Sequence, residues 1–210
     1  MRIAETFSSL QGEGLFAGMP SFFIRVAGCN LDCDWCDTPD ARDAASGREL
    51  SVETLLQAAT EADLAHVVMT GGEPTLYATE LVELCRALRA QGRAITVETN
   101  ATRYVDCRPH LWSLSPKPDA WDSGMLQQFV QSEIPVQMKL VPGNASEADD
   151  LVERCNCLGL PLERVMLMPR ARSRAEFLAA AAWLAPYCIE QRVRFGVRLH
   201  TIIWDNTPSR

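Results

Sequence analysis

The stretch GCNLDCDWCDT, residues 28–38, brings Cys29, Cys33 and Cys36 together in one loop with the spacing C-x-x-x-C-x-x-C. The loop directly follows an apolar, β-rich run at residues 21–27, so the three thiolates can converge at the end of a strand. Cysteine thiolates hold iron–sulfur clusters, and a cubane held by three of them leaves one iron open to a further ligand. A closed zinc site would need a fourth ligand, which no nearby His or Cys supplies. The loop therefore indicates an iron–sulfur site with an open iron.

Outside this loop, short β-rich runs alternate with helical patterns, which predicts successive βα units and a largely parallel sheet. The expected strands are residues 21–27, 66–70, 95–99, 111–115, 136–141, 165–168 and 194–199. These units are too few to close an eight-fold barrel of roughly 250 residues. The predicted fold class is therefore α/β, a partial, open TIM-like βα barrel, with ligands bound by the loops that follow the strands.

Helices are predicted from apolar periodicity and from capping patterns. Residues 76–91 form an amphipathic pattern, because apolar residues recur at helical spacing. Those apolar positions are Leu81, Leu84, Cys85 and Leu88. S-x-x-D/E patterns that start at Ser146 and Ser173 predict that two further helices begin there. The chain has no low-complexity tract or Gly/Ser linker, so we expect one domain that spans residues 1–210.

Composition narrows the class of protein. The chain has 210 residues, of which 47% are hydrophobic, and its net charge of −7 favours a small-molecule substrate over nucleic acid. We see no secretory signal, and the longest mostly apolar stretch, residues 177–189, is a packed helix too short to span a bilayer. We therefore expect a cytoplasmic protein without membrane contact. In that reducing compartment, eight cysteines favour cluster ligation over disulfide bonds.

Two of the predicted strands end in motifs that suit a ligand site. TGGEP, residues 70–74, has two glycines that let a ligand approach the backbone, and Glu73 offers an acceptor for an ammonium group. Alone, that motif would be a structural turn. VETN, residues 97–100, places Glu98 and Asn100 where they can hydrogen-bond a ribose, although Asn100 is also a common turn residue.

Two lysines lie at or near the ends of later strands. Lone lysines are usually solvated surface charges. Lys117 in SPK, residues 115–117, can nevertheless pair with a carboxylate at this edge of the sheet, and Lys139 lies in a neighbouring strand.

The N-terminal residues 5–25 carry Gln11, Glu13 and Arg25 around several glycines. The amide and the carboxylate offer hydrogen bonds, and the guanidinium fork suits a carboxylate. The plainer interpretation makes residues 11–14 a surface turn.

Together these motifs resemble one family, the radical S-adenosylmethionine (SAM) enzymes called 7-carboxy-7-deazaguanine synthases. The resemblance runs from Glu5 to Thr38 and continues through TGGEP, VETN, SPK, KLV and the C-terminal RLHTIIWDN, residues 198–206. Members are carbon–nitrogen lyases that convert 6-carboxy-5,6,7,8-tetrahydropterin to 7-carboxy-7-deazaguanine with release of ammonia, for queuosine and other 7-deazapurines. The resemblance implies the same radical ring contraction here and a radical SAM type of open barrel.

Matched motif by motif, the resemblance implies a role for individual residues. The cysteines of the loop would hold a 4Fe-4S cluster, and Thr38 would bind Mg²⁺, which keeps several waters in such sites. The implied substrate-binding residues are Leu10, Gln11, Gly12, Glu13, Arg25, Thr70 and His200, of which His200 could equally be an ordinary histidine. The implied SAM-binding residues are Trp35, Gly72, Glu73, Glu98, Asn100, Ser115, Pro116, Lys117, Met168, Pro169, Arg170 and Ala171.

Two segments depart from the family pattern. Ala101 follows VETN where a glycine is common, and MPRA, residues 168–171, stands where a QPxD-like segment is expected. Without the side chains of that segment, we expect residues 168–171 to contact SAM through their backbone. The remaining cysteines are expected to be buried and inert, and those two apart on a helix face different ways. They are Cys85, Cys107, Cys155, Cys157 and Cys188.

Two other functions share part of this pattern. A glycyl-radical-enzyme activase has the same cysteine spacing but acts on a protein backbone, whereas Arg25 and LQGEG at residues 10–14 favour a small carboxylated substrate. An iron–sulfur electron-transfer protein would have a fourth cysteine ligand and no SAM motifs. The family also implies a flavodoxin or ferredoxin as reductant and a homodimer.

Overall fold

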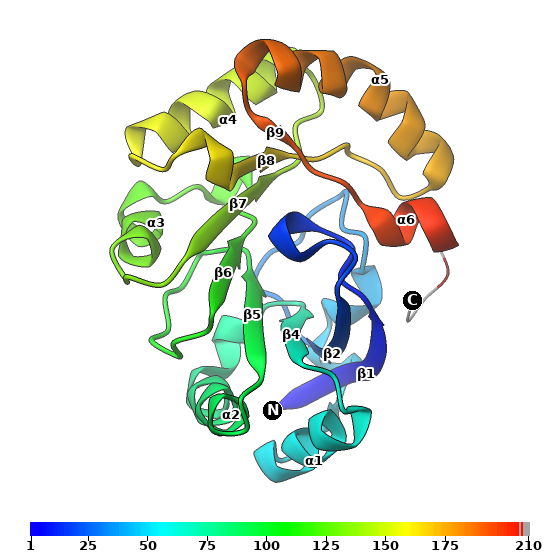
Figure 1. Cartoon of the computed structure of the whole chain (residues 1–210), viewed down its shortest axis with the longest axis vertical. Helices are drawn as coiled ribbons and strands as arrows, with labels where there is room; N and C mark the ends of the chain where they lie inside the picture. The colour runs from blue at the N-terminus through cyan, green and yellow to red at the C-terminus, as the bar shows by residue number, and fades with distance from the viewer. Residues whose placement is uncertain (206, 208–210) are drawn as a thin grey trace.

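The computed structural model describes residues 1–205 and 207, and its central feature is one curved, nine-stranded sheet (Figure 1). The strands are β1 (Arg2–Leu10), β2 (Pro20–Val26), β3 (Arg48–Glu49), β4 (His66–Gly71), β5 (Ala94–Thr99), β6 (Leu111–Leu114), β7 (Val136–Leu140), β8 (Val165–Leu167) and β9 (Arg194–Phe195). The helices are α1 (Val52–Ala62), α2 (Ala78–Ala90), α3 (Ser123–Val130), α4 (Ala145–Cys157), α5 (Arg174–Gln191) and α6 (Leu199–Trp204).

The sheet is parallel from β2 onward and remains open. Its strand order is β3-β1-β2-β4-β5-β6-β7-β8-β9, and within the described residues the outer strands β3 and β9 do not pair with each other. Each parallel neighbour follows in chain order, which is the arrangement that successive βα crossovers give. The predicted open α/β barrel is confirmed.

Alternation along the strands separates an apolar face from a polar face. The apolar residues, such as Val67 and Met69 of β4 and Met138 of β7, belong to the core under the helices, which line the outer side of the sheet in Figure 1. On β7 the residues on either side of Met138, which are Gln137 and Lys139, are polar yet buried. Such an inner face is costly unless its polar groups bind one another or a ligand.

Helix α2 confirms the amphipathic pattern predicted for residues 76–91. Its four predicted apolar positions are all 0% exposed, and Glu80 lies in the first turn and Arg89 in the last, where each charge complements the helix dipole. Helix α5 begins where predicted, with Ser173 as N-cap accepting a hydrogen bond from the Glu176 amide.

Two local expectations are wrong, and one strand lies outside the predicted pattern. The predicted strand at residues 194–199 pairs only over β9, because the chain leaves the sheet after Phe195 and Leu199 already begins α6. Helix α4 is capped by Asn144, whose side chain accepts the Glu147 amide, and not by Ser146, because the helix starts two residues earlier than its pattern suggested. Strand β1 was not predicted at all.

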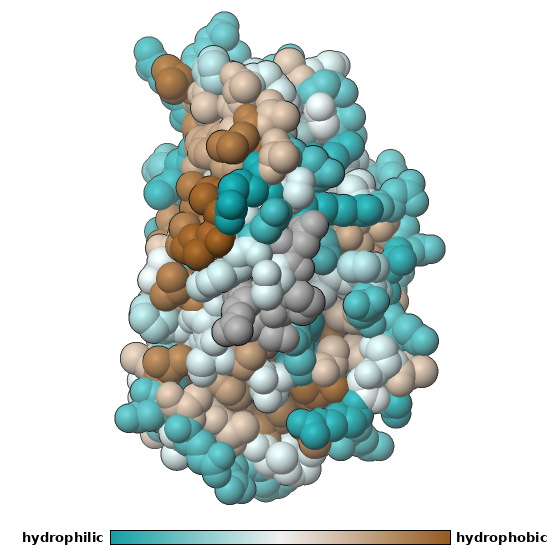
Figure 2. Space-filling view, turned by 90° about the vertical axis from the view of Figure 1, so that its right-hand side faces the viewer, coloured by the Kyte–Doolittle hydropathy of each residue, from teal (hydrophilic) through white to brown (hydrophobic). Residues whose placement is uncertain are grey.

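The surface carries a few exposed apolar side chains on α5 and α6: Leu178, Ile189 and Ile203. Figure 2, which views the molecule from the right-hand side of Figure 1, shows apolar surface in brown beside strongly polar surface. Within the described residues, no helix is long and apolar enough to cross a membrane.

Candidate active site

A cavity of about 950 Å³ lies at the carboxyl ends of the parallel strands. It is lined by most residues for which the sequence motifs imply a role: Leu10, Gln11, Gly12, Glu13, Arg25, Cys29, Cys33, Trp35, Cys36, Thr38, Thr70, Gly72, Glu98, Asn100, Ser115, Lys117, Met168, Ala171 and His200. Glu73, Pro116, Pro169 and Arg170 are not among the lining residues. The tertiary structure thus brings segments from the whole chain to one wall.

The cysteine loop forms one part of this wall. Cys29, Cys33 and Cys36 are free thiols, each partly exposed to the cavity. Two N–H groups point at the Cys29 sulfur, from the Leu31 amide at 3.5 Å and from Asn100 Nδ2 at 3.9 Å. Burial raises the pKa of the Cys29 and Cys33 thiols, so a bound metal is what would hold them as thiolates. The three thiols and the N–H donors around them fit a cluster with three cysteine ligands.

Glu73 does not line the cavity, but it holds residues that do. Its side chain is 0% exposed, and Oε1 accepts hydrogen bonds from the amide and hydroxyl of Thr75 and from Thr99 Oγ1 at 2.7–3.0 Å. Oε2 accepts the Asn100 amide at 2.7 Å. Burial raises the pKa of Glu73. In this structure, therefore, the carboxylate expected to accept an ammonium group fixes the end of β5 and the place of Asn100.

The Trp35 ring is in contact with two cations. Lys117 Nζ is 4.7 Å from the centre of the indole ring and Arg170 Cζ is 5.4 Å from it. Lys117 also donates to Ser115 Oγ at 2.9 Å, and burial lowers its pKa. The Arg170 guanidinium turns outward to Glu147 at 2.9 Å, which is why it does not line the cavity.

Glu13 lines the same cavity, where it meets two cations to which the sequence motifs assign no role. Its Oε2 is 2.8 Å from Lys139 Nζ, and its Oε1 is 3.1 Å from Arg198 Nε. Burial opposes ionisation, but these two cations hold the pKa of Glu13 well below its usual range. In the sequence Lys139 is a lone lysine and Arg198 is one residue of the C-terminal motif, because neither pairing with Glu13 is visible there.

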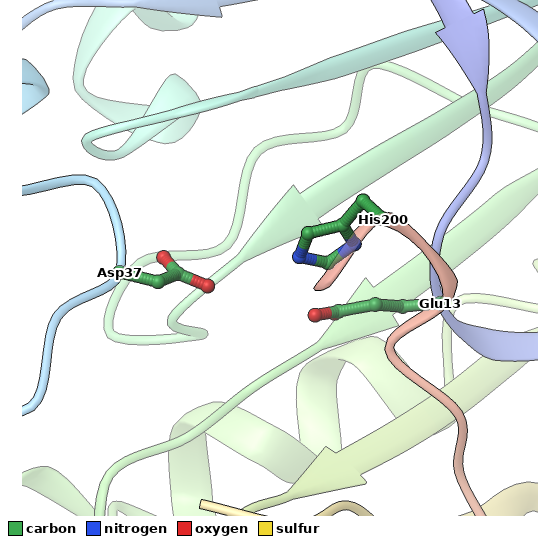
Figure 3. A group of neighbouring side chains, drawn as sticks. All are labelled: Glu13, Asp37 and His200. Atoms are coloured by element: carbon green, nitrogen blue, oxygen red, sulfur yellow. The ribbon is translucent and has the colours of Figure 1, made fainter. Parts of the chain in front are cut away.

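Asp37 and His200 flank Glu13, as Figure 3 shows, and one ligand atom of each of the three lies within 4.8 Å of the others. Arg198 Nη2 also donates to Asp37 Oδ2. The two carboxylates of this group are therefore already paired with protein cations, which makes it a poor place for a metal ion. Thr38, the residue expected to bind Mg²⁺, donates its hydroxyl to Asp37 Oδ1 at 2.9 Å.

Glu98 connects Glu13 to the rest of the inner face. Its Oε1 accepts Lys139 Nζ at 2.9 Å and Gln11 Nε2 at 3.3 Å, and its Oε2 accepts Thr70 Oγ1 at 2.9 Å. The ends of β4, β5 and β7 and the loop after β1 are therefore joined through a single carboxylate.

Arg25 is positioned by β1, the strand that the sequence pattern did not predict. Its Nε donates to Glu5 Oε1 at 2.8 Å, and its guanidinium lies 5.6 Å from the centre of the Phe7 ring. Phe7 in turn stacks on Phe23 at 4.9 Å. All of these side chains line the cavity, so an aromatic and basic wall stands beside the cysteine loop.

The MPRA segment and the C-terminal motif also meet the cavity. Met168 and Ala171 line it, and Arg198 donates to the Ala171 carbonyl, so this segment presents backbone and apolar groups there. Arg198 and His200 lie inside the C-terminal motif, whose last residue, Asn206, lies outside the described residues. Of the five other cysteines, four are buried as predicted, but Cys157 is exposed, because it is two residues from the buried Cys155 on α4.

Comparison with known proteins identifies the family of this chain. The Radical SAM superfamily model matches residues 23–114. A 7-carboxy-7-deazaguanine synthase of Rhodopirellula baltica is 38% identical, over 94% of this chain and 84% of that protein. The enzyme of the same name from Pyrobaculum aerophilum is 35% identical, over 100% of this chain and 97% of its own.

Solved structures give the same result. QueE from Escherichia coli superposes with a TM-score of 0.76 and 26% identity, over 95% of this chain and 94% of its own. A structure described as native anSMEcpe with bound AdoMet and Kp18Cys peptide shares the fold. Its TM-score is 0.55 at 15% identity, over 83% of this chain and 63% of that one. This chain belongs to the 7-carboxy-7-deazaguanine synthase family and is an enzyme of the radical SAM type.

Proposed function

We propose that this enzyme converts 6-carboxy-5,6,7,8-tetrahydropterin into 7-carboxy-7-deazaguanine and ammonia, with SAM regenerated. Family membership gives it a radical SAM role in 7-deazaguanine biosynthesis. The particular substrate is supported by the cavity, whose wall contains the three-cysteine loop together with a basic side chain, Arg25, and an acidic one, Glu13. A carboxylated ring with N–H donors matches that wall, because a guanidinium binds a carboxylate and a carboxylate accepts N–H groups.

The protein's own residues bind and orient in this proposal. Cys29, Cys33 and Cys36 would hold the 4Fe-4S cluster, which with SAM supplies radical chemistry when bound. Lys117 would pair with the SAM carboxylate, while Glu98 and the segment around Trp35 would contact its nucleoside part. The cavity would exclude water from the reacting atoms.

For the substrate, Arg25 would bind the pterin carboxylate, while Glu13 and Gln11 would accept and donate hydrogen bonds at the ring. Thr38 would contribute its hydroxyl to Mg²⁺, with substrate and water oxygens completing the coordination. The Asp37 carboxylate, which accepts the Thr38 hydroxyl at 2.9 Å, supports this by orienting that oxygen.

Three further properties belong to the proposal. We infer a homodimer, and we infer that a flavodoxin or ferredoxin delivers the electron. A single domain over residues 1–210 and a cytoplasmic location stay predictions of the sequence.

Anaerobic turnover of the reconstituted protein tests the proposal. With 6-carboxytetrahydropterin, SAM, dithionite and Mg²⁺, mass spectrometry should detect 7-carboxy-7-deazaguanine. Cys33→Ala should abolish the product, while Cys157→Ala, an exposed cysteine outside the cavity, should leave it unchanged. SAM cleavage without deazaguanine would refute the substrate and leave a radical SAM enzyme of another substrate, with the glycyl-radical activase as the next candidate.

A further inference from the structure

Five charged side chains of alternating sign form one network along the cavity wall: Asp37, Arg198, Glu13, Lys139 and Glu98. Each neighbouring pair is in hydrogen-bonding contact, and the network links the cysteine loop to the ends of β5 and β7. All five line the cavity. The family motifs assign roles to Glu13 and Glu98, but to neither of the two cations between them.

Both cations are buried. Lys139 is 3% exposed and Arg198 is 6% exposed, so neither can be a solvated surface charge. Removing a charge from water is costly, and each cation is compensated only because it contacts two carboxylates. Lys139 lies between Glu13 and Glu98, and Arg198 lies between Glu13 and Asp37.

Glu13 is where the two cations meet. Lys139 donates a hydrogen bond to Oε2 of Glu13 and Arg198 donates one to Oε1, so both oxygens of the carboxylate are held. A carboxylate accepts about four hydrogen bonds, two at each oxygen. Each oxygen therefore keeps capacity for an N–H group of a ligand, and the plane of the carboxylate is fixed before the ligand arrives.

We propose that Lys139 and Arg198 are positioning residues for the substrate, which hold the Glu13 carboxylate in one orientation so that it accepts the N–H donors of the pterin ring. The inference rests on the proposed function, because it takes the pterin as the ligand. Arg198 also orients Asp37, which accepts the Thr38 hydroxyl, and it therefore ties the orientation of Glu13 to the expected Mg²⁺ ligand. Preorganisation of this kind raises affinity because fewer groups must be ordered on binding.

Equilibrium binding separates this role from catalysis. The reconstituted holoenzyme with SAM and Mg²⁺, but without dithionite, is titrated anaerobically with 6-carboxytetrahydropterin in a calorimeter. Lys139→Met and Arg198→Met should each weaken binding by at least about 10-fold, because each frees one oxygen of Glu13 and leaves a carboxylate unpaired. Arg198→Lys keeps the charge but lacks the fork that spans two carboxylates, so it should restore only part of the affinity.

A double-mutant cycle shows whether the lysine acts through Glu13. Lys139→Met should cost less than about 2-fold in a Glu13→Gln background, because the oxygen that it orients has already been altered. Arg93→Met is a matched control: Arg93 is a mostly buried cation that donates to the Leu64 carbonyl at 2.6 Å, outside the cavity, and its loss should leave pterin affinity unchanged.

Each outcome decides the inference. Affinity within about 2-fold of wild type in both methionine variants overturns it, as does an equal loss in the wild-type and Glu13→Gln backgrounds. Thermal unfolding and the cluster absorbance identify a variant that does not fold, in which case the variants at the other of the two positions, Lys139 or Arg198, decide alone. A wild-type enzyme that binds no pterin would instead refute the proposed function, and the inference with it.

Discussion

His200 packs directly on Gly12, so closely that a Cβ at residue 12 would lie 2.1 Å from the imidazole Nδ1. The backbone reinforces this contact, because the Leu199 amide donates to the Gly12 carbonyl at 2.8 Å. Gly12 is required here for close approach and not for an unusual backbone angle, since its φ lies outside the left-handed range. The loop after β1 and the start of α6 therefore form one unit.

Gly12→Ala is expected to displace His200 and lower kcat/KM for the pterin by about 10-fold or more, because small displacements of binding groups are costly. Cluster content should not change. Steady-state kinetics and iron analysis check this. Gly124→Ala, in α3 and remote from the cavity, is the control, and unchanged kinetics in Gly12→Ala would show that His200 has no part in the site.

Gln137 supports the turn that follows the substrate loop. Its Oε1 accepts the Leu15 amide at 2.7 Å and its Nε2 donates to Ser113 Oγ at 2.8 Å, and the Gln137 and Ser113 side chains are both buried. Gln137→Leu leaves these groups unpaired, so we expect unfolding to become easier by about 2 kcal/mol. We also expect KM for the pterin to rise. Denaturant unfolding and kinetics measure the two effects, and an unchanged KM would argue against the coupling of this turn to the site.

His66 predicts a pH dependence of stability. It lies fully buried between Ser21 Oγ at 2.7 Å and Thr96 Oγ1 at 2.9 Å, and burial lowers its pKa from 6.5 to about 4. Below pH 6.5 the unfolded chain therefore takes up a proton that the folded protein refuses, so acid favours unfolding.

From pH 6.5 down to pH 5, His66 should lower the free energy of unfolding by about 1.5 kcal/mol, because the slope rises toward 1.36 kcal/mol per pH unit as the unfolded histidine becomes fully protonated. His66→Gln lacks this titration and should show a shallower slope by about one proton in urea unfolding across that range. Equal slopes in the two proteins would contradict the assignment.

Cys155 and Cys157 provide a test of the roles of the remaining cysteines. Cys155 is buried in the core, where desolvation raises its pKa to about 12, whereas Cys157 is exposed. Cys155→Ser should destabilise the fold by about 1–2 kcal/mol, since it buries a hydroxyl in apolar surroundings, and Cys157→Ser should have no effect. Neither should change iron content after reconstitution, and iron loss in either variant would mean a second ligand set.

The strands that were predicted correctly are those whose apolar residues lie against the helices, because burial produces a continuous apolar signal. Strand β1 gave no such signal: of its nine residues only Ile3 is buried, and polar residues such as Glu5 face the cavity. Glu73 is a second position at which the local pattern and the tertiary contacts differ. Its motif indicated a ligand contact, but contacts with Thr99 and Asn100, over twenty residues away, are what turn it inward.

The sequence by itself determined the chemistry of this protein. The cysteine spacing, the strand-end motifs and the open βα pattern are local, and local spacing is sufficient to place three thiolates in one loop or a glycine at a strand end. The tertiary structure decided which charges meet. Glu13 pairs with Lys139 and Arg198 across 126 and 185 residues, and only folding, which buries these charges together and makes unpaired ones costly, could select those partners.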